Sequence, residues 1–208
     1  MSSPDPAKRD VLISKALAYL LRHGALKEKM AIDEDGFVKI DDVLSHNRLK
    51  TNKATRADLE RIVASNDKQR FSIKGDYICA NQGHSIKSVS DSNLTLLNED
   101  TIPDEIFHGT YYNKLEMIYK SGGLRRMTRN HIHFTSNSDK LTNISGVRYN
   151  ANCLVYVDVR RCMADGIPFY KSANDVVLTP GDAEGKVGCE YFARVVDRKT
   201  GKAVDFQK

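Results

Sequence analysis

In the first 80 residues, segments with the apolar spacing of helices are followed by two segments with that of strands. This order constrains the fold more than any other feature of the sequence. Apolar residues between Leu12 and Leu21 recur at helical spacing, and Gly24 follows as a stop signal. The run Thr55–Ser65 predicts another helix. Two short strand-like runs, 70–73 and 77–80, then flank a Lys-Gly-Asp turn and predict a hairpin. Helices that end in a hairpin form a winged helix, a scaffold that binds nucleic acids or proteins.

The second half of the chain contains short strand-like runs broken by Gly, Asn and Pro. These runs are Ile106–Phe107, His131–Phe134, Leu154–Val159, Val176–Leu178 and Tyr191–Val195, with one helix at about Lys114–Ser121. The Ser-, Asn- and Asp-rich stretch Ser85–Glu105 lacks strong periodicity. We therefore predict an α+β protein with a first lobe at residues 1–90, a linker at 91–105 and a second lobe, a compact mixed sheet, at 106–208.

The composition is that of a globular chain. Of 208 residues, 40% are hydrophobic and 28% are charged, and no apolar run approaches the ~18 residues of a membrane span. The N-terminal segment lacks the apolar core of a signal peptide. The four cysteines form no CxxC pair, so we expect reduced and mostly buried thiols in a cytoplasmic or nuclear protein that is not secreted.

Basic residues are unevenly distributed, although the net charge is only +5. Arg48, Lys50 and Lys53 lie in a stretch without acidic residues, and a second such stretch includes Arg129, His131 and His133. A solvated face is the common role of such runs, but two of them in a balanced chain favour an anionic ligand.

Three arginines are candidates for holding a phosphate. Arg22 and His23 end the first helix, where cations also complement the helix dipole. Arg70 begins a predicted strand, and Arg148 follows Gly146 in a loop, so both have an ordinary surface role as the alternative. If the three converge, their planar guanidinium groups suit a phosphate dianion, because each binds two oxygens at once and stays charged.

His108, Gly109 and Thr110 follow a short strand, where a glycine lets backbone N–H groups approach a ligand closely. His131 and His133 share one face of a strand, but no third ligand stands at a suitable spacing for zinc. A calcium loop beginning at Asp33 would need a glutamate at its twelfth position, which is Leu44. We therefore predict no metal.

Several short motifs in fixed order give the chain a resemblance to a known family. They span about Ile13 to Val196 and comprise Leu21-Arg22-His23, Asp35-Gly36-Phe37-Val38, Asp67-Lys68-Gln69-Arg70-Phe71, Gln82-Gly83-His84-Ser85, His108-Gly109-Thr110, Gly123-Leu124-Arg125-Arg126-Met127 with Arg129 and His131-Ile132-His133, Gly146-Val147-Arg148, and Phe169-Tyr170-Lys171-Ser172 with Asn174. In this combination the chain resembles the RNA 2′-phosphotransferase family of the tRNA-splicing type. Thr135 and Ile132 are small departures, where the family often has serine and valine.

The resemblance implies a winged-helix RNA lobe followed by an ADP-ribosyltransferase-like NAD lobe. It implies transfer of an internal 2′-phosphate from RNA, typically at a tRNA splice junction, to NAD, which is consumed as a co-substrate. The products are 2′-OH RNA, nicotinamide and ADP-ribose 1″,2″-cyclic phosphate, formed through an ADP-ribosylated 2′-phosphate. The expected partner is 2′-phosphorylated RNA, with no membrane and no metal, and the protein is expected to be a monomer.

The resemblance also assigns site residues by their positions. The catalytic set is Arg22, His23, Arg70 and Arg148. The residues expected to line the NAD site are His108, Gly109, Thr110, Arg129, His131, His133, Ser172 and Asn174. The residues expected to contact RNA are Arg48, Lys50, Lys53, Lys68, Gln82 and His84.

This chemistry suits a site rich in arginine and poor in carboxylates. A phosphate monoester is already an anion at neutral pH, since its second pKa is about 6, so no general base is needed to create the nucleophile. Arg22, Arg70 and Arg148 would then hold the phosphate and stabilise charge that develops on its oxygens. His23 would either donate a hydrogen bond to the phosphate or protonate the leaving oxygen, and the sequence leaves both roles open.

Two alternative functions remain at this point. The first is an ADP-ribosyltransferase that stops after the first step and leaves a capped phosphate. The second is a winged-helix RNA-binding module whose second lobe is structural. Release of nicotinamide separates an enzyme from a binding module, and release of the cyclic phosphate separates the two enzymes.

Overall fold

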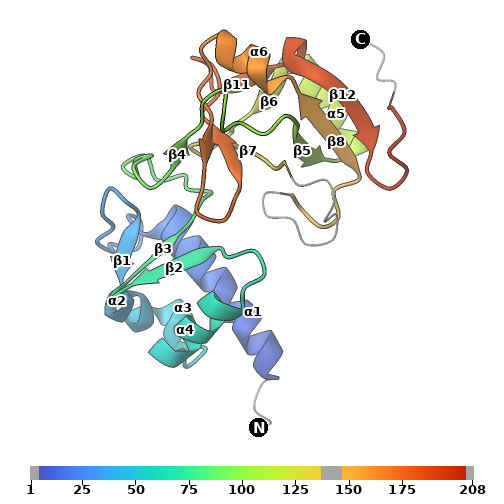
Figure 1. The fold of residues 1–208 in the computed structure, drawn as a ribbon. Coiled ribbons are helices and arrows are strands. Elements are labelled where there is room, and N and C mark those ends of the chain that lie inside the picture. Colours follow the sequence, from blue (N-terminus) through green and yellow to red (C-terminus); the bar gives the residue numbers. More distant parts are fainter. Residues whose placement is uncertain (1–4, 137–146, 205–208) are drawn as a thin grey trace. The chain divides into compact units, whose positions relative to one another are not determined.

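The structure, a computed structural model, describes residues 5–136 and 147–204. The chain divides into two compact units, Met1–Asn93 and Leu94–Lys208 (Figure 1). Both units combine helices with small antiparallel sheets. The prediction of an α+β protein is confirmed, whereas the winged-helix and ADP-ribosyltransferase-like lobes stay predictions.

The first unit is mainly helical and carries one three-stranded sheet. Its elements are α1 (Pro6–Tyr19), a π-helical turn (Leu20–Gly24), β1 (Phe37–Lys39), α2 (Ile40–Ser45), α3 (Asn47–Lys50), α4 (Arg56–Ser65), β2 (Phe71–Lys74) and β3 (Tyr77–Ala80). The sheet order is β1-β3-β2, and both pairings are antiparallel. The hairpin predicted around Lys74-Gly75-Asp76 is β2–β3, with Lys74 opposite Tyr77.

Helix α1 begins six residues before the apolar pattern indicates. The carboxylate of Asp5 accepts a hydrogen bond from the Ala7 backbone N–H, and Pro6 occupies the first helical position. The apolar spacing marked only the part of the helix that is buried, where Ile13 and Leu17 enter the core of the unit. The preceding turns face solvent, so they carry no apolar signal.

The end of this helix is a π-helical turn that carries Arg22 and His23. Turns of this type are rare and are frequent at functional sites. Gly24 closes the turn against the Tyr19 ring, because a Cβ atom at Gly24 would lie 2.6 Å from Cε1 of that ring. The sequence indicated where the helix stops but not the wider turn.

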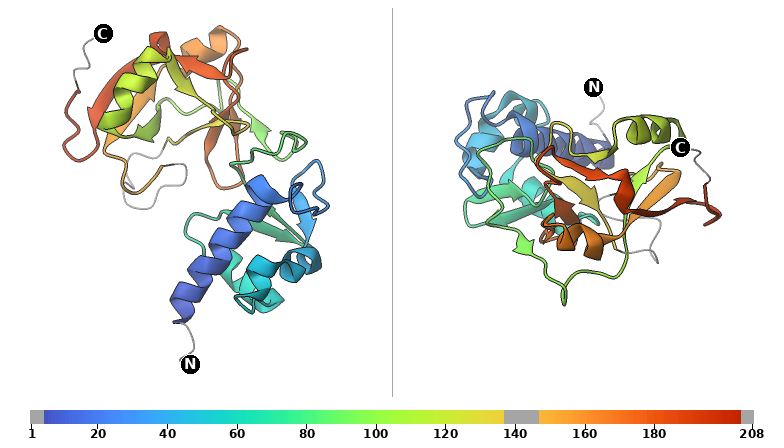
Figure 2. Two further views of the ribbon diagram at one scale, coloured as in Figure 1. Left: turned by 180° about the vertical axis from the view of Figure 1, so that it is seen from behind. Right: turned by 90° about the horizontal axis from the view of Figure 1, so that it is seen from above.

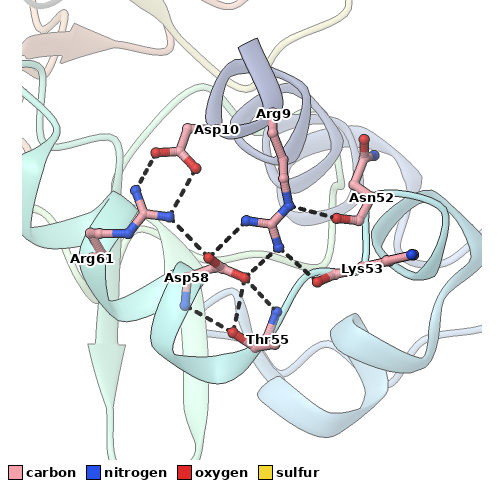
Figure 3. A network of polar contacts seen from close by, with 7 residues as sticks. All are labelled: Arg9, Asp10, Asn52, Lys53, Thr55, Asp58 and Arg61. Atoms are coloured by element: carbon pink, nitrogen blue, oxygen red, sulfur yellow. Dashed lines mark hydrogen bonds and ion pairs between the residues drawn. The ribbon is translucent and has the colours of Figure 1, made fainter. Parts of the chain in front are cut away.

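Asp58 links the N-terminal part of α1 to α4 (Figure 3). Its carboxylate accepts hydrogen bonds from Arg9 at 2.7 and 2.9 Å and from Arg61 at 2.9 Å. It also completes a capping box with Thr55 at the start of α4. Arg61 also pairs with Asp10, so α1 and α4 each contribute one acidic and one basic residue to this network. The Arg9 guanidinium holds the pKa of Asp58 well below its usual range.

We expect Asp58→Ala to lower the free energy of unfolding by about 2 to 3 kcal/mol, because it removes a helix cap and charge-assisted hydrogen bonds together. Since folding lowers the pKa of Asp58, the charge-dependent part of the wild-type advantage is complete above the unfolded pKa of about 3.9 and begins to fall below it, with the full loss reached only below the lower folded pKa. Urea unfolding from pH 7 down to pH 3 measures this difference. Asp76→Ala is the control, because its ion pair with Arg56 is exposed and should contribute less than about 1 kcal/mol. Equal losses in the two variants would contradict the prediction.

The second unit consists of three small antiparallel sheets and two helices among its described residues. Its elements are β4 (Thr95–Leu96), β5 (Ile106–Thr110), α5 (Tyr112–Lys120), β6 (Gly123–Arg125), β7 (Ile132–Phe134), β8 (Cys153–Val157), α6 (Val159–Ala164), β9 (Tyr170–Lys171), β10 (Val177–Thr179), β11 (Lys186–Gly188), a 3₁₀ turn (Cys189–Tyr191) and β12 (Phe192–Asp197). The sheet orders are β4-β9-β10-β7, β11-β6 and β12-β8-β5.

Helix α5 lies beside the β12-β8-β5 sheet in Figure 1 and in the left view of Figure 2. Its Leu115 and Ile118 are buried in the core of this unit, and its Tyr119 ring meets Phe192 of β12 edge-on at 5.7 Å. An isolated bridge joins β5 to the residue after β7, where the backbones of Phe107 and Thr135 exchange hydrogen bonds of 2.9 and 3.0 Å. This bridge brings β5 beside the end of β7.

Two sequence-based boundaries differ from the structure. The strand expected over Leu154–Val159 ends at Val157, because the Asp158 carboxylate accepts from the Arg161 N–H and starts α6 instead. The polar stretch Ser85–Glu105 contributes buried side chains to both units, including Val89 in the first core and Ile102 in the second. Its few apolar residues are too far apart to give a periodic signal.

All four cysteines carry thiols rather than disulfides, as predicted, and three of them are buried. Burial raises the pKa of Cys79 and Cys162 to about 12 and that of Cys153 to about 11, so these three thiols stay protonated at neutral pH. Within residues 5–136 and 147–204, no helix combines the length and apolar character that a membrane crossing requires.

Candidate active site

Arg22 and Arg70 lie in one groove of the first unit. The groove has a volume of about 410 Å³ and runs between α1 and the end of α4. Ser14, Lys15 and Ala18 line it from α1, and Ser65 and Asn66 line it from α4. Two residues 48 positions apart in the sequence are therefore brought to one place by the packing of α1 on α4 and β2.

The side chain of Arg22 is held from two directions. Its guanidinium carbon lies 6.0 Å from the centre of the Phe71 ring at the start of β2. On another side it packs on Gly83, where an added Cβ would lie 3.5 Å from the Arg22 Cδ and Nε atoms. Gly83 has φ +89°, which an L-residue with a side chain rarely adopts. The Gly83 position of the Gln82–Ser85 motif therefore supports Arg22.

Arg70 is positioned by Asn66, the residue that ends α4. The Asn66 Oδ1 atom accepts from the Arg70 Nη1 at 3.3 Å and from its backbone N–H at 3.4 Å. It also accepts from the Lys68 backbone N–H at 3.1 Å, which fixes the turn before β2. Burial lowers the pKa of Arg70, and the charge of Asp67 raises it in part. A half-buried guanidinium in this groove favours an anionic ligand.

His23 is exposed at the end of the π-helical turn. Its Nδ1 lies 3.0 Å from the Ser85 Oγ, and the Ser85 backbone N–H donates to the Arg22 carbonyl at 2.9 Å. The segment Gln82–Ser85 thus supports two neighbouring candidate residues, one through a side chain and the other through Gly83 and the backbone. The tautomer of His23 decides which atom of the Ser85 contact donates.

The other RNA candidates occupy two places in the first unit. Lys68, Gln82 and His84 are half-buried in the segments that flank the hairpin. Arg48, Lys50 and Lys53 are exposed in and after α3 and do not line the groove. Among these three, the Arg48 guanidinium stacks 4.3 Å above the Tyr19 ring. The Lys53 carbonyl accepts from Arg9 at 2.7 Å (Figure 3).

In the second unit, the bridge between β5 and β7 positions His108. The His108 Nδ1 donates to the His133 carbonyl at 2.8 Å, and its ring meets Phe134 edge-on at 6.0 Å. Burial lowers the pKa of His108, the bond to His133 raises it in part, and the charges of Arg129 and Arg148 lower it again. The ring is therefore neutral at pH 7, with the proton on Nδ1, so Nε2 is an acceptor.

Arg148 is exposed in the loop before β8, and its charge reaches both His108 and Arg129. Burial lowers the pKa of Arg129, and the like charge of Arg148 lowers it further. The structure thus brings Arg148 close to two of the NAD candidates. Gly146 of the same motif lies outside the described residues, and the convergence of Arg148 with Arg22 and Arg70 stays a prediction.

The remaining NAD candidates are mostly buried polar residues of the second unit. Ser172 donates to the Asn174 Oδ1 at 2.8 Å inside the turn between β9 and β10. Thr110, His131 and His133 are also buried. A Cβ at Gly109 would lie 2.4 Å from the Val147 Cγ1, so the glycine allows the loop that leads to Arg148 to lie against β5.

Two residues absent from the sequence-based set have a clear structural role. Asn66 holds Arg70, and Arg198 holds the loop that carries Arg148. Asn66 stands directly before the Asp67–Phe71 motif, and an asparagine after a helix is a turn signal that points to such a role. Arg198 lies 50 positions from Arg148, and nothing in the sequence links them. Among the described residues, no group of three His, Cys, Asp or Glu side chains is arranged to hold a metal ion.

Comparison with known proteins identifies the family of this chain. Residues 8–181 match the model of a family described as RNA 2′-phosphotransferase, Tpt1 / KptA family. The chain is 42% identical over 182 residues to the tRNA 2′-phosphotransferase of Saccharomyces cerevisiae, covering 83% of this chain and 79% of that protein. It is 43% identical over 195 residues to tRNA 2′-phosphotransferase 1 of Danio rerio, covering 89% and 85%.

A bacterial protein is also similar. The chain is 36% identical over 172 residues to a probable RNA 2′-phosphotransferase of Streptomyces coelicolor, covering 83% of this chain and 91% of that protein. The chain belongs to the RNA 2′-phosphotransferase family and is an enzyme of the transferase class. The resemblance inferred from the short motifs is confirmed.

Proposed function

We propose that this protein removes an internal 2′-phosphate from RNA, typically at a tRNA splice junction, in a reaction that consumes NAD. The observation that carries the proposal is that Arg22 and Arg70 meet in one groove of a chain that belongs to the RNA 2′-phosphotransferase family. The names of its relatives in Saccharomyces cerevisiae and Danio rerio support tRNA as the substrate class.

The groove in the first unit has the charge that a phosphate dianion needs. Arg22 and Arg70 supply two guanidinium groups from different elements, and Lys15 adds an ammonium group from α1. Among the described residues that line the groove, Asp10 alone is acidic, and Arg61 pairs with its carboxylate. Since the groove residues come from α1, the π-helical turn, α4 and the turn before β2, which pack together, they are suited to hold the phosphate in one orientation.

The donor and acceptor set of the second unit fits NAD. Half-buried Arg129 suits the pyrophosphate, and the acceptor Nε2 of His108 suits a ribose hydroxyl. Buried Ser172 and Asn174, with Thr110, His131 and His133, add polar groups to the buried residues of this unit, which are otherwise mostly apolar. This combination of few polar groups and many apolar neighbours is typical of a small-molecule site.

The roles of the residues follow from the chemistry. When bound, NAD supplies an electrophilic anomeric carbon with nicotinamide as its leaving group, and the adjacent 2″-hydroxyl that finally accepts the phosphate and releases the RNA. Arg22 and Arg70 orient the phosphate, and Arg148 stabilises charge on its oxygens. His23 either donates a hydrogen bond to the phosphate or protonates the leaving 2′-oxygen of the RNA. The products are 2′-OH RNA, nicotinamide and ADP-ribose 1″,2″-cyclic phosphate.

A single incubation tests this function. The protein is mixed with NAD and a 2′-phosphorylated oligonucleotide, with EDTA in a parallel sample, and the products are resolved by mass. We expect 2′-OH RNA, nicotinamide and the cyclic phosphate in equal amounts, with and without EDTA. An accumulating ADP-ribosylated phosphate would instead indicate an ADP-ribosyltransferase. RNA binding without nicotinamide release would indicate a binding module, and loss of activity in EDTA would indicate a metal.

The architecture proposed for the two units agrees with this division of roles. We propose that residues 1–90 form a winged-helix RNA lobe and residues 106–208 an ADP-ribosyltransferase-like NAD lobe, joined through 91–105. The order of helices and the terminal hairpin in the first unit supports the former. We further propose that the protein acts as a monomer in the cytoplasm or nucleus, where its thiols stay reduced.

The exposed basic residues of the first unit give a separate prediction about RNA affinity. We expect Arg48→Gln, Lys50→Gln and Lys53→Gln together to weaken binding of long RNA and to reduce its salt dependence, because contacts to backbone phosphates release counterions. Single-turnover rates on a short, saturating substrate should stay unchanged, since these residues do not line the groove. Binding measured against log salt checks the slope.

The matched control replaces Lys27, Lys29 and Lys39 with glutamine, because these are exposed lysines of the same unit with no proposed contact. An equal loss in the control would mean that only net charge matters. An unchanged slope in the test variant would mean that Arg48, Lys50 and Lys53 are a solvated face.

A further inference from the structure

Arg198 holds the loop that carries Arg148. Its Nη1 donates to three backbone carbonyls, those of Arg148 at 3.0 Å, Tyr149 at 2.8 Å and Ala151 at 3.1 Å. Its backbone N–H donates to the Asn152 carbonyl at 3.0 Å. One residue directly after β12 therefore bonds to four of the five positions from Arg148 to Asn152, all except Asn150. Arg198 lies outside the residues 8–181 that the family model matches.

The loop is fixed at its other side by β5. The Asn152 backbone N–H donates to the Thr110 carbonyl at 3.1 Å, and the Asn152 Oδ1 accepts from the Tyr112 N–H at 3.0 Å. Within the loop, the Ala151 N–H donates to the Arg148 carbonyl at 3.1 Å. The backbone at Arg148 is thus anchored to β5 through Asn152 and to β12 through Arg198.

Electrostatics explains why such an anchor is needed. Arg148 and half-buried Arg129 are close enough for each charge to act on the other, and like charges repel. Arg148 is exposed, so without a tether its side chain and loop would relax away from Arg129 and His108 toward water. Hydrogen bonds from a cation to several carbonyls resist this movement, because they act on the backbone and leave the Arg148 guanidinium available to a ligand.

We infer that Arg198 is a positioning residue for the proposed reaction: it holds the Arg148 loop so that the Arg148 guanidinium stays beside Arg129 and His108. This inference rests on the proposed function, in which Arg148 stabilises the phosphate. Displacement of a catalytic group by about 1 Å can cost about 10²-fold in rate. Arg198→Ala should therefore lower kcat about 10- to 100-fold with little change in the KM for RNA, which binds in the other unit.

Lysine should restore most of this loss. The three side-chain bonds from Arg198 to the carbonyls of residues 148, 149 and 151 start at one nitrogen, so a single ammonium group can replace that donor. We expect Arg198→Lys to stay within about fivefold of wild type. The matched control is Arg160→Ala, an exposed arginine of the same unit that bonds to the Glu99 carbonyl and to Asp104. It should retain wild-type turnover.

A double-mutant cycle distinguishes positioning from general stability. If Arg198 acts through Arg148, then Arg198→Ala causes no further loss of kcat in an Arg148→Ala background. If the two losses multiply, Arg198 does not act through Arg148 and the inference is overturned. The same conclusion follows if Arg198→Lys is as slow as Arg198→Ala while remaining folded by circular dichroism.

A second readout does not require activity. Arg148 lowers the pKa of His108, so Arg198→Ala and Arg148→Ala should both raise it, as measured by NMR titration of the His108 ring. A rise in Arg148→Ala alone would overturn the inference. If Arg198→Ala does not fold, Arg198→Gln replaces it in both measurements. A wild-type protein without phosphotransferase activity would contradict the proposed function, whereas this titration would still test the tether.

Discussion

Arg148→Ala is expected to lower turnover about 10²- to 10³-fold, which is the usual loss when one preorganised donor to a developing charge is removed. Arg148 is exposed in a loop, and its described backbone contacts are made by its carbonyl rather than by its side chain. Truncation of the side chain should therefore leave the loop and the second unit folded. The loss should appear in kcat, because charge on the phosphate oxygens increases only as the reaction proceeds.

Arg148→Lys should recover only part of this loss. A point charge on a flexible stem cannot reproduce two parallel N–H donors to one phosphate. This contrasts with Arg198, whose three side-chain bonds to the described residues 148–151 all start at one nitrogen. Single-turnover rates with saturating NAD and a short 2′-phosphorylated oligonucleotide measure both variants, with Arg160→Ala as the control. Wild-type turnover in Arg148→Ala would remove this residue from the active site.

Loss of Arg22 is expected to have an effect of similar size, but on phosphate binding as well as on rate. Its Nε and Nη2 atoms are buried in the groove, and its guanidinium lies over the Phe71 ring. Arg22→Ala should lower kcat/KM for the RNA about 10³-fold, because it removes a contact made both to the bound substrate and to the transition state. Arg70→Ala should behave in the same way, since Arg70 lines the same groove.

Two controls separate this effect from general damage. Lys39→Ala removes an exposed cation from β1 of the same unit and should leave kcat/KM unchanged. Asn66→Ala leaves both arginines in place but removes the acceptor that holds Arg70, so it should cause an intermediate loss. Thermal unfolding shows whether each variant is folded. If folded Arg22→Ala keeps wild-type kcat/KM, the groove does not bind the phosphate.

Local sequence patterns predicted the helices that have one buried face and the hairpin that has a sharp turn. The apolar spacing in α1 and α4 and the Lys74-Gly75-Asp76 turn gave these elements to within a few residues, except for the solvent-exposed start of α1. The patterns missed α3, α6 and the short strands β4, β6, β9 and β11. Elements of two to six residues carry too few side chains to show a period, and the four strands among them are stabilised by pairing with other strands.

For the candidate site, too, the sequence predicted one part and the structure alone showed another. Short motifs in fixed order identified Arg22, Arg70, His108 and Arg148, and the family match confirms the family that they indicated. The sequence did not show that Arg22 and Arg70 share a groove, that Asn66 holds Arg70, or that His108 bonds to the His133 carbonyl. The shared groove and the His108 bond depend on segments that are far apart in the sequence and that packing brings together. The Asn66 contact spans only four residues, but it depends on the turn that the chain makes before β2.

The sequence by itself determined the chemistry available to this protein: permanently charged arginines, a histidine at the end of a helix, and thiols that the fold buries. It did so because residue type and local spacing are properties of short segments. Only the tertiary structure decided which cations meet and what holds them. Arg198 is the clearest case, since its three bonds to the Arg148 loop join residues 47 to 50 positions apart. Such a contact forms because β12 pairs with β8, and no local pattern records that pairing.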